Sequence, residues 1–114
     1  MFQKSCSVRI NSVQSNVCHV DLEEIMAVPE VEHFLIPSSI HLPKVDDAEI
    51  LEEFTYMFNT ATNEWIHGSS KTKIGLIMFI ESARSLIELS KICEKAMKLK
   101  EKSALIPEAL VFGR

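Results

Sequence analysis

The feature that most constrains the fold is an unbroken apolar run, IGLIMFI, at residues 74–80. A strand with one face in water usually alternates apolar and polar residues, whereas this run offers no polar face. Strands buried on both faces are typical of parallel sheets in α/β proteins. The run therefore predicts a buried strand of a parallel sheet, and it stops at Glu81, a carboxylate one step beyond its end.

The rest of the chain alternates β-prone and helical patterns around this run. Helical spacing is clearest over 46–60, where apolar residues share one face and acidic residues crowd the first turns. We predict strands near 6–11, 38–43, 74–80 and 108–112, helices over 21–30, 46–60 and about 83–101, and a surface loop over 61–73. The last strand is expected to start after Pro107. This alternation is the pattern of parallel βα units, with the helices on one side of the sheet.

Length, charge and cysteine content limit the possible classes of function. A chain of 114 residues holds at most one domain with a moderate core. Its net charge of -4 argues against a nucleic-acid partner, which needs a clustered positive face, and no apolar run reaches the length of a membrane span. Cys6, Cys18 and Cys93 lack the spacing of a disulfide frame or a zinc site, so we expect reduced, inert thiols.

Charged residues at or near the ends of the expected strands are the candidates for a functional site. Parallel α/β proteins bind ligands at the carboxyl ends of their strands, where Glu81, Lys44 and, nearly, Arg9 fall. Glu81 has a plain alternative, because the helix dipole also favours an acid as N-cap or in the first turn of the next helix. Lys44 is equally explained as a solvent-facing loop residue. Arg9 is harder to explain, since an arginine within a β-run needs a polar environment or a partner.

Four motifs carry a resemblance to a known family. They are SVRINSV, SSIHLPKVDDAEI, LIMFIESARSLIELSKIC and EALVFG, and together they cover almost the whole chain. In this order they resemble successive strand ends of the HpcH/HpaI aldolase and citrate lyase β-subunit family, whose citrate lyase beta-like members in animal mitochondria are citramalyl-CoA lyases. The resemblance implies an α/β fold of parallel βα units, about half of a TIM barrel. Residues 1–114 would form a single partial domain that corresponds to the third to sixth strands.

The resemblance also implies roles for two residues. Arg9 is similar in position to the family's VRVN arginine, which binds the acid group of the substrate. Glu81 is similar in position to the glutamate of the family's VET or VES motif, one of two carboxylates that hold Mg²⁺. The second carboxylate belongs to a GGEDF-type motif, but here LVFG is followed by Arg114, where the sequence ends. By the same resemblance, the first two strands with their substrate-binding residues and the last two with the catalytic acid or base are missing, so this chain alone should be inactive or very weak.

The function implied is that of a Mg²⁺-dependent carbon–carbon lyase acting on a 3-hydroxyacyl-CoA thioester such as citramalyl-CoA. Breaking a carbon–carbon bond beside a carbonyl leaves negative charge that a divalent cation stabilises, and an arginine can clamp a carboxylate with two parallel hydrogen bonds. Two alternatives stay open: a non-catalytic interaction or regulatory fragment of this fold, and an unrelated small α/β binding domain. The resemblance further implies a mitochondrial location, although no targeting peptide is visible. The open edges of half a barrel predict self-association or a homo-oligomer.

Overall fold

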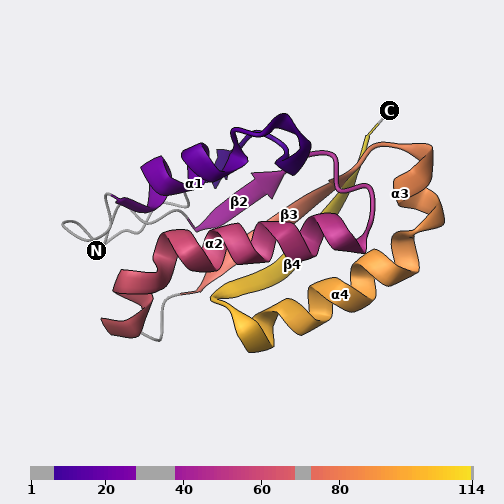
Figure 1. The fold of residues 1–114 in the computed structure, drawn as a ribbon. Helices are drawn as coiled ribbons and strands as arrows, with labels where there is room; N and C mark the ends of the chain where they lie inside the picture. The colour runs from indigo at the N-terminus through magenta and orange to yellow at the C-terminus, as the bar shows by residue number, and fades with distance from the viewer. Residues whose placement is uncertain (1–6, 28–37, 69–72, 114) are drawn as a thin grey trace, which may run out of the picture.

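The computed structural model describes residues 7–27, 38–68 and 73–113 of the chain. Its strands form one parallel sheet in the order β1-β2-β3-β4, so the predicted parallel α/β fold is confirmed (Figure 1). The strands are β1 (Ser7–Arg9), β2 (Ser39–Leu42), β3 (Ile74–Ile80) and β4 (Leu105–Phe112). The helices are the short 3₁₀ helix η1 (Val13–Ser15), α1 (Cys18–Ala27), α2 (Ala48–Gly68), α3 (Ala83–Ile87) and α4 (Leu89–Lys102).

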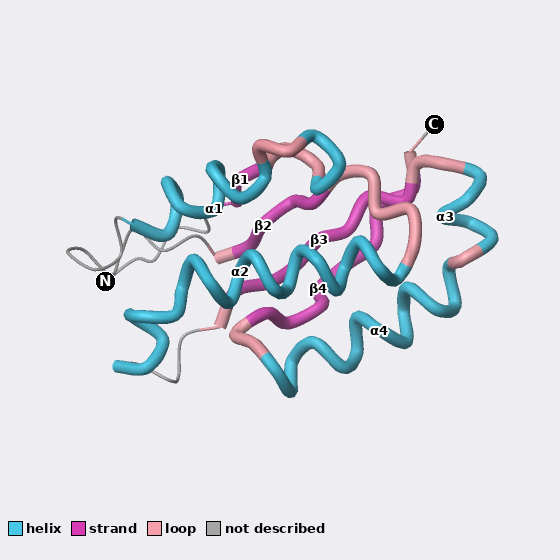
Figure 2. The backbone as a smooth tube through the Cα atoms, viewed as in Figure 1, coloured by secondary structure: helices cyan, strands magenta, loops and turns pink. Residues whose placement is uncertain are grey.

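The helices α1, α2 and α4 cover one face of the sheet, as predicted (Figure 2). Residues of β3 alternate between burial against this helical layer and partial exposure on the opposite side. We call that opposite side the open face; it includes Arg9, His41, Ile77 and Phe79, which the strand register places on the same side. The expectation that β3 is buried on both faces is therefore wrong, because no described element covers the open face.

The core lies between the sheet and the helical layer. Phe54 and Phe58 of α2 are fully buried, with ring centroids 6.2 Å apart, and they belong to one cluster with Leu22 of α1 and Ile92 of α4. The apolar face expected over 46–60 is thus confirmed. None of the described helices is long and apolar enough to cross a membrane.

The predicted lengths of two helices are wrong. The surface loop expected over 61–73 is in large part helix, because α2 continues to Gly68. The polar residues there lower helix propensity only modestly, and no proline or glycine interrupts the helix before Gly68. The single helix expected over about 83–101 is divided at Glu88 into α3 and α4. Leu86 and Ile87 are 58% and 81% exposed, so α3 does not continue the buried face of α4.

The last strand is longer than predicted. β4 begins at Leu105, so Pro107 lies within the strand rather than before it. Proline cannot donate a ladder hydrogen bond and is tolerated mainly in edge strands and at irregularities. Both conditions hold, because β4 is the last strand of the described sheet and the pairing shifts register between Leu76 and Ile77.

Candidate functional site

Glu81 directly follows β3 and lies against the ends of the two neighbouring strands. Its Oε1 accepts a hydrogen bond of 3.2 Å from the backbone N–H of Lys44, which lies just after β2. On the other side is Gly113, just after β4, where a Cβ would lie 3.3 Å from Cγ and 3.7 Å from Oε2 of Glu81. The carboxylate is therefore half-buried at the carboxyl edge of the sheet, which is where the sequence predicted it.

The helix that follows is capped by Ser82 and not by Glu81. Ser82 Oγ accepts a 3.0 Å hydrogen bond from the backbone N–H of Ser85, and Ser85 Oγ accepts one of 3.1 Å from the backbone N–H of Ser82. This reciprocal pair satisfies the start of α3. The alternative in which Glu81 serves as the N-cap or first-turn acid is thus wrong; its structural contact is with Lys44 instead.

Arg9 is exposed at the end of β1, on the open face. Its Cζ lies 5.2 Å from the centroid of the Phe79 ring, within the range of a cation–π interaction. His41, the register partner of Arg9, packs its ring 5.7 Å from the same phenyl ring. No ion pair or hydrogen bond engages the Arg9 guanidinium among the residues that the structure describes. Arg9 is thus supported by an aromatic face and accessible to an acidic ligand.

The strand register keeps Arg9 and Glu81 apart. Arg9 pairs with His41, which pairs with Ile77, so Glu81 lies two strands across and four residues farther along. With strands about 4.8 Å apart and a rise of about 3.3 Å per residue, roughly 16 Å separates the two Cα atoms. Both residues border the open face, and the Arg9 side chain reaches Phe79, two residues before Glu81. Whether they share one substrate pocket stays a prediction.

The carboxylate oxygens of Glu81 at this edge of the sheet are of the kind that Mg²⁺ binds. Mg²⁺ prefers oxygen ligands and is usually held by one or two carboxylates together with waters and substrate oxygens. Glu81 supplies such a carboxylate, and Oε2 accepts no hydrogen bond from the described part of the chain. No group of three His, Cys, Asp or Glu side chains there is arranged to hold a metal ion by itself. Within the described residues, Glu81 is thus a candidate for a single protein ligand, and its role in metal binding stays a prediction.

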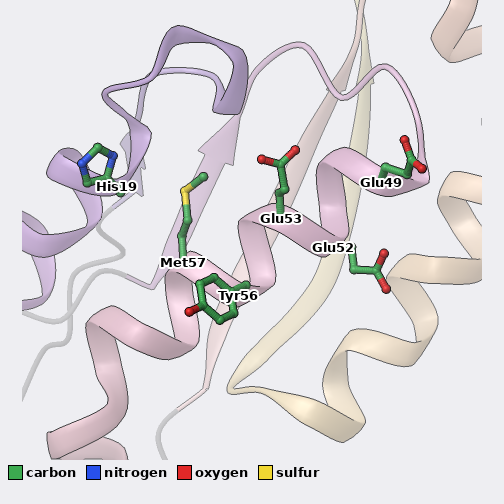
Figure 3. Close-up of a pocket in the computed structure, with 6 residues that line it drawn as sticks. All are labelled: His19, Glu49, Glu52, Glu53, Tyr56 and Met57. Carbon is green, nitrogen blue, oxygen red and sulfur yellow. The ribbon is translucent and has the colours of Figure 1, made fainter.

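A pocket between α1 and α2 is a second candidate, and the sequence did not predict it (Figure 3). Its lining consists of His19, Glu49, Glu52, Glu53, Tyr56 and Met57. The crowding of acids early in 46–60 was the one sequence signal for it. In Figure 3 the three glutamates spread along α2 and point in different directions, and Glu52 pairs with Lys95 at 3.3 Å. The pocket contains neither Arg9 nor Glu81, and its acids form a solvated helix face.

Cys18 is buried near the start of α1, and its thiol is not activated. Burial raises the pKa of Cys18 from 9.0 to about 11, and the nearby Asp21 carboxylate adds to the increase. Because the thiolate is the nucleophilic form, the expectation of an inert thiol is confirmed for Cys18. Cys93 is partly exposed, and Cys6 lies outside the described residues.

Comparison with known proteins shows a similarity to one kind of enzyme. The chain is 32% identical over 109 residues to the mitochondrial citramalyl-CoA lyase of Rattus norvegicus, 33% over 109 residues to that of Mus musculus, and 32% over 107 residues to that of Homo sapiens. The chain is similar to one part of these mitochondrial citramalyl-CoA lyases. Each match covers 93% of this chain but only 29% of the relative. No protein-family model matches the chain.

The fold of the chain is consistent with its similarity to these lyases. A four-stranded parallel sheet with its helices on one side is consistent with part of a TIM-barrel-like unit. The resemblance carried by the four strand-end motifs is confirmed, and the relatives that match are lyases named as mitochondrial.

Proposed function

We propose that the chain is part of a Mg²⁺-dependent carbon–carbon lyase acting on a 3-hydroxyacyl-CoA thioester such as citramalyl-CoA. The similarity to three citramalyl-CoA lyases over 93% of the chain supports this class of reaction. The observation that carries the proposal is the position of Glu81, a half-buried carboxylate at the carboxyl end of β3 that caps no helix. Its Oε1 is held by the Lys44 backbone, which leaves Oε2 as the oxygen for a cation.

Two residues of this chain have roles in the proposal. Glu81 would hold the cation, and Arg9 would bind the acid group of the substrate through two parallel hydrogen bonds. The Phe79 ring beneath the guanidinium restricts its position, so less freedom is lost when a ligand binds. When bound, Mg²⁺ supplies stabilisation of the negative charge that develops on the substrate carbonyl as the carbon–carbon bond breaks.

We further propose that this chain alone turns over substrate very weakly or not at all. It spans 29% of the length of its relatives, and the resemblance assigns only Glu81 of the expected pair of metal carboxylates to it. General acid–base help, for which we assign no residue in this chain, typically contributes about 10²–10⁴-fold. The names of the relatives support a mitochondrial location for the protein.

The test places this chain in the context of a complete enzyme. The matched 109 residues of the rat lyase are replaced by the corresponding residues of this chain, and Mg²⁺-dependent cleavage of citramalyl-CoA is measured. We expect cleavage, a loss of kcat of about 100-fold or more in Glu81→Gln, and no change in Glu94→Gln, which removes an exposed acid on α4. Arg9→Gln should chiefly raise KM, by about 10- to 100-fold, because it removes a charged hydrogen-bond donor.

Two results would count against the proposal. Equal activity of Glu81→Gln and Glu94→Gln would leave Glu81 with its structural contact to Lys44 and no role in metal binding. A chimaera that folds but stays inactive would favour the non-catalytic interaction or regulatory fragment instead.

A further inference from the structure

Lys44 has an unusual backbone whose two polar groups are held by side chains from both neighbouring strand ends. Its φ of 54° lies in the left-handed region, which costs a residue other than glycine about 1–2 kcal/mol. Its N–H donates to Oε1 of Glu81 at 3.2 Å, while its carbonyl oxygen accepts from Nε2 of Gln14 at 3.1 Å. Gln14 belongs to η1, which follows β1. These contacts offset the cost of the left-handed conformation.

Asp46 ties the same loop to both sides. Its Oδ2 accepts from Nε2 of Gln14 at 3.2 Å, and its Oδ1 accepts from the hydroxyl of Ser82 at 2.8 Å. Ser82 is the residue directly after Glu81 and is the N-cap of α3. A backbone bond of 3.2 Å from Val45 N to Phe79 O adds a tie to β3. The loop after β2 is therefore fixed between the segments that follow β1 and β3.

We propose that Gln14 and Asp46 are positioning residues that fix the Glu81 carboxylate as a metal ligand. They do so by holding the loop in the conformation that directs the Lys44 N–H at Oε1. The proposal rests on the proposed function, in which Glu81 holds a divalent cation. Groups that orient a metal ligand through hydrogen bonds typically contribute about 10- to 100-fold to metal affinity, although they never touch the ion.

The test uses two substitutions and a control in the 114-residue chain. Gln14→Met removes the amide donor without a change of charge, and Asp46→Asn removes one charge and one of the two accepted hydrogen bonds. The control, Glu94→Gln, removes the same charge from an exposed acid on α4, outside both candidate sites. Hydrogen exchange of the Lys44 amide is measured by NMR, and affinity for Mn²⁺, which prefers the same oxygen ligands as Mg²⁺, is measured by EPR.

We expect exchange at Lys44 to become about 3- to 10-fold faster in both variants, as the loss of one hydrogen bond predicts. Mn²⁺ affinity should fall by about 3- to 10-fold in both, less than for a group that hydrogen-bonds a metal ligand directly, while the control changes neither quantity beyond a small charge effect. Unchanged exchange at Lys44 in both variants would overturn the proposal. Faster exchange with unchanged Mn²⁺ affinity would also overturn it, provided that Glu81→Gln does weaken Mn²⁺ binding.

A different Mn²⁺ result is expected if the proposed function itself is wrong. Glu81→Gln would then bind Mn²⁺ as tightly as the unmodified chain, which would remove Glu81 from the metal site. The exchange rate at Lys44 would still decide whether Gln14 and Asp46 hold the contact between Lys44 and Glu81.

Discussion

At the scale of single residues, the site depends on a backbone conformation as much as on charged side chains. Lys44 is in the left-handed region, directly after Pro43 at the end of β2, and in this conformation its N–H donates to Glu81. Its side chain is exposed and faces water, as a plain loop lysine would. The contribution of Lys44 to the site is therefore made by its main chain.

Cys18 makes the free energy of unfolding depend on pH. The pKa of the thiol is about 11 in the folded chain and near the ordinary 9.0 in the unfolded chain. The stabilisation from the neutral thiol is thus fully present below pH 9 and is lost as the pH rises through 11. We predict that the free energy of unfolding falls more steeply between pH 9 and 11 in the unmodified chain than in Cys18→Ala. Urea unfolding at several pH values measures this, and parallel curves for the two proteins would contradict the prediction.

At the scale of elements, the N-terminus of α3 contacts the loop that lies beside Glu81. Ser82 caps the helix and also donates to Asp46, so one hydroxyl serves both α3 and the loop after β2. We predict that Ser82→Ala lowers the free energy of unfolding by about 1 kcal/mol or more, the usual cost of a lost N-cap. Ser90→Ala on the exposed side of α4 is the control and should change stability little. Equal stability of the two variants in urea would show that the cap is unimportant.

The elements also show what a sequence can predict and why. The apolar face of α2 was visible because burial repeats along a helix with a fixed period, whereas β3 was visible because its apolar run is unbroken. The end of α2 was missed because polar residues mark exposure and not the end of a helix. The division at Glu88 was missed because Leu86 and Ile87 fit a helical pattern although both are exposed.

Within the site, the sequence predicted positions but not contacts. Glu81 at a strand end followed from where the apolar run stops, and Arg9 followed from a charge within a β-run. The partner of Glu81 could not be predicted, because it is a backbone N–H presented by a lysine at positive φ. The Phe79 ring beneath Arg9 depends on pairing across two strand boundaries, which no local pattern records.

At the scale of the whole molecule, no described element packs on the open face of the sheet. Ile106 and Val111 of β4 are 39% and 37% exposed, and the register places them beside Gly75 and Phe79 of β3. A TIM barrel closes with eight parallel strands and fills its interior with such side chains, whereas this sheet has four. We therefore predict that the chain self-associates in solution through the β4 part of the open face, at the opposite edge of the sheet from Arg9.

Two substitutions, one on the open face and one on α3, test the predicted self-association. Val111→Lys places a charge on the open face and should shift the chain toward the monomer in analytical ultracentrifugation. Ile87→Lys places the same charge on α3, where the side chain is 81% exposed, and should leave association unchanged. A compact monomer at all concentrations, with a sharp and cooperative unfolding transition, would contradict the prediction.

The proposed function requires that a divalent cation binds at the carboxyl edge of the sheet through Glu81. Paramagnetic broadening by Mn²⁺ in the amide NMR spectrum of the chain tests it most directly, because the effect falls steeply with distance from the ion. We predict that the amide signals of Lys44, Glu81 and Gly113, which surround the carboxylate, broaden first and recover when Mg²⁺ is added in excess. Broadening centred instead on the glutamates at 49, 52 and 53 of α2, or spread evenly over the chain, would contradict it.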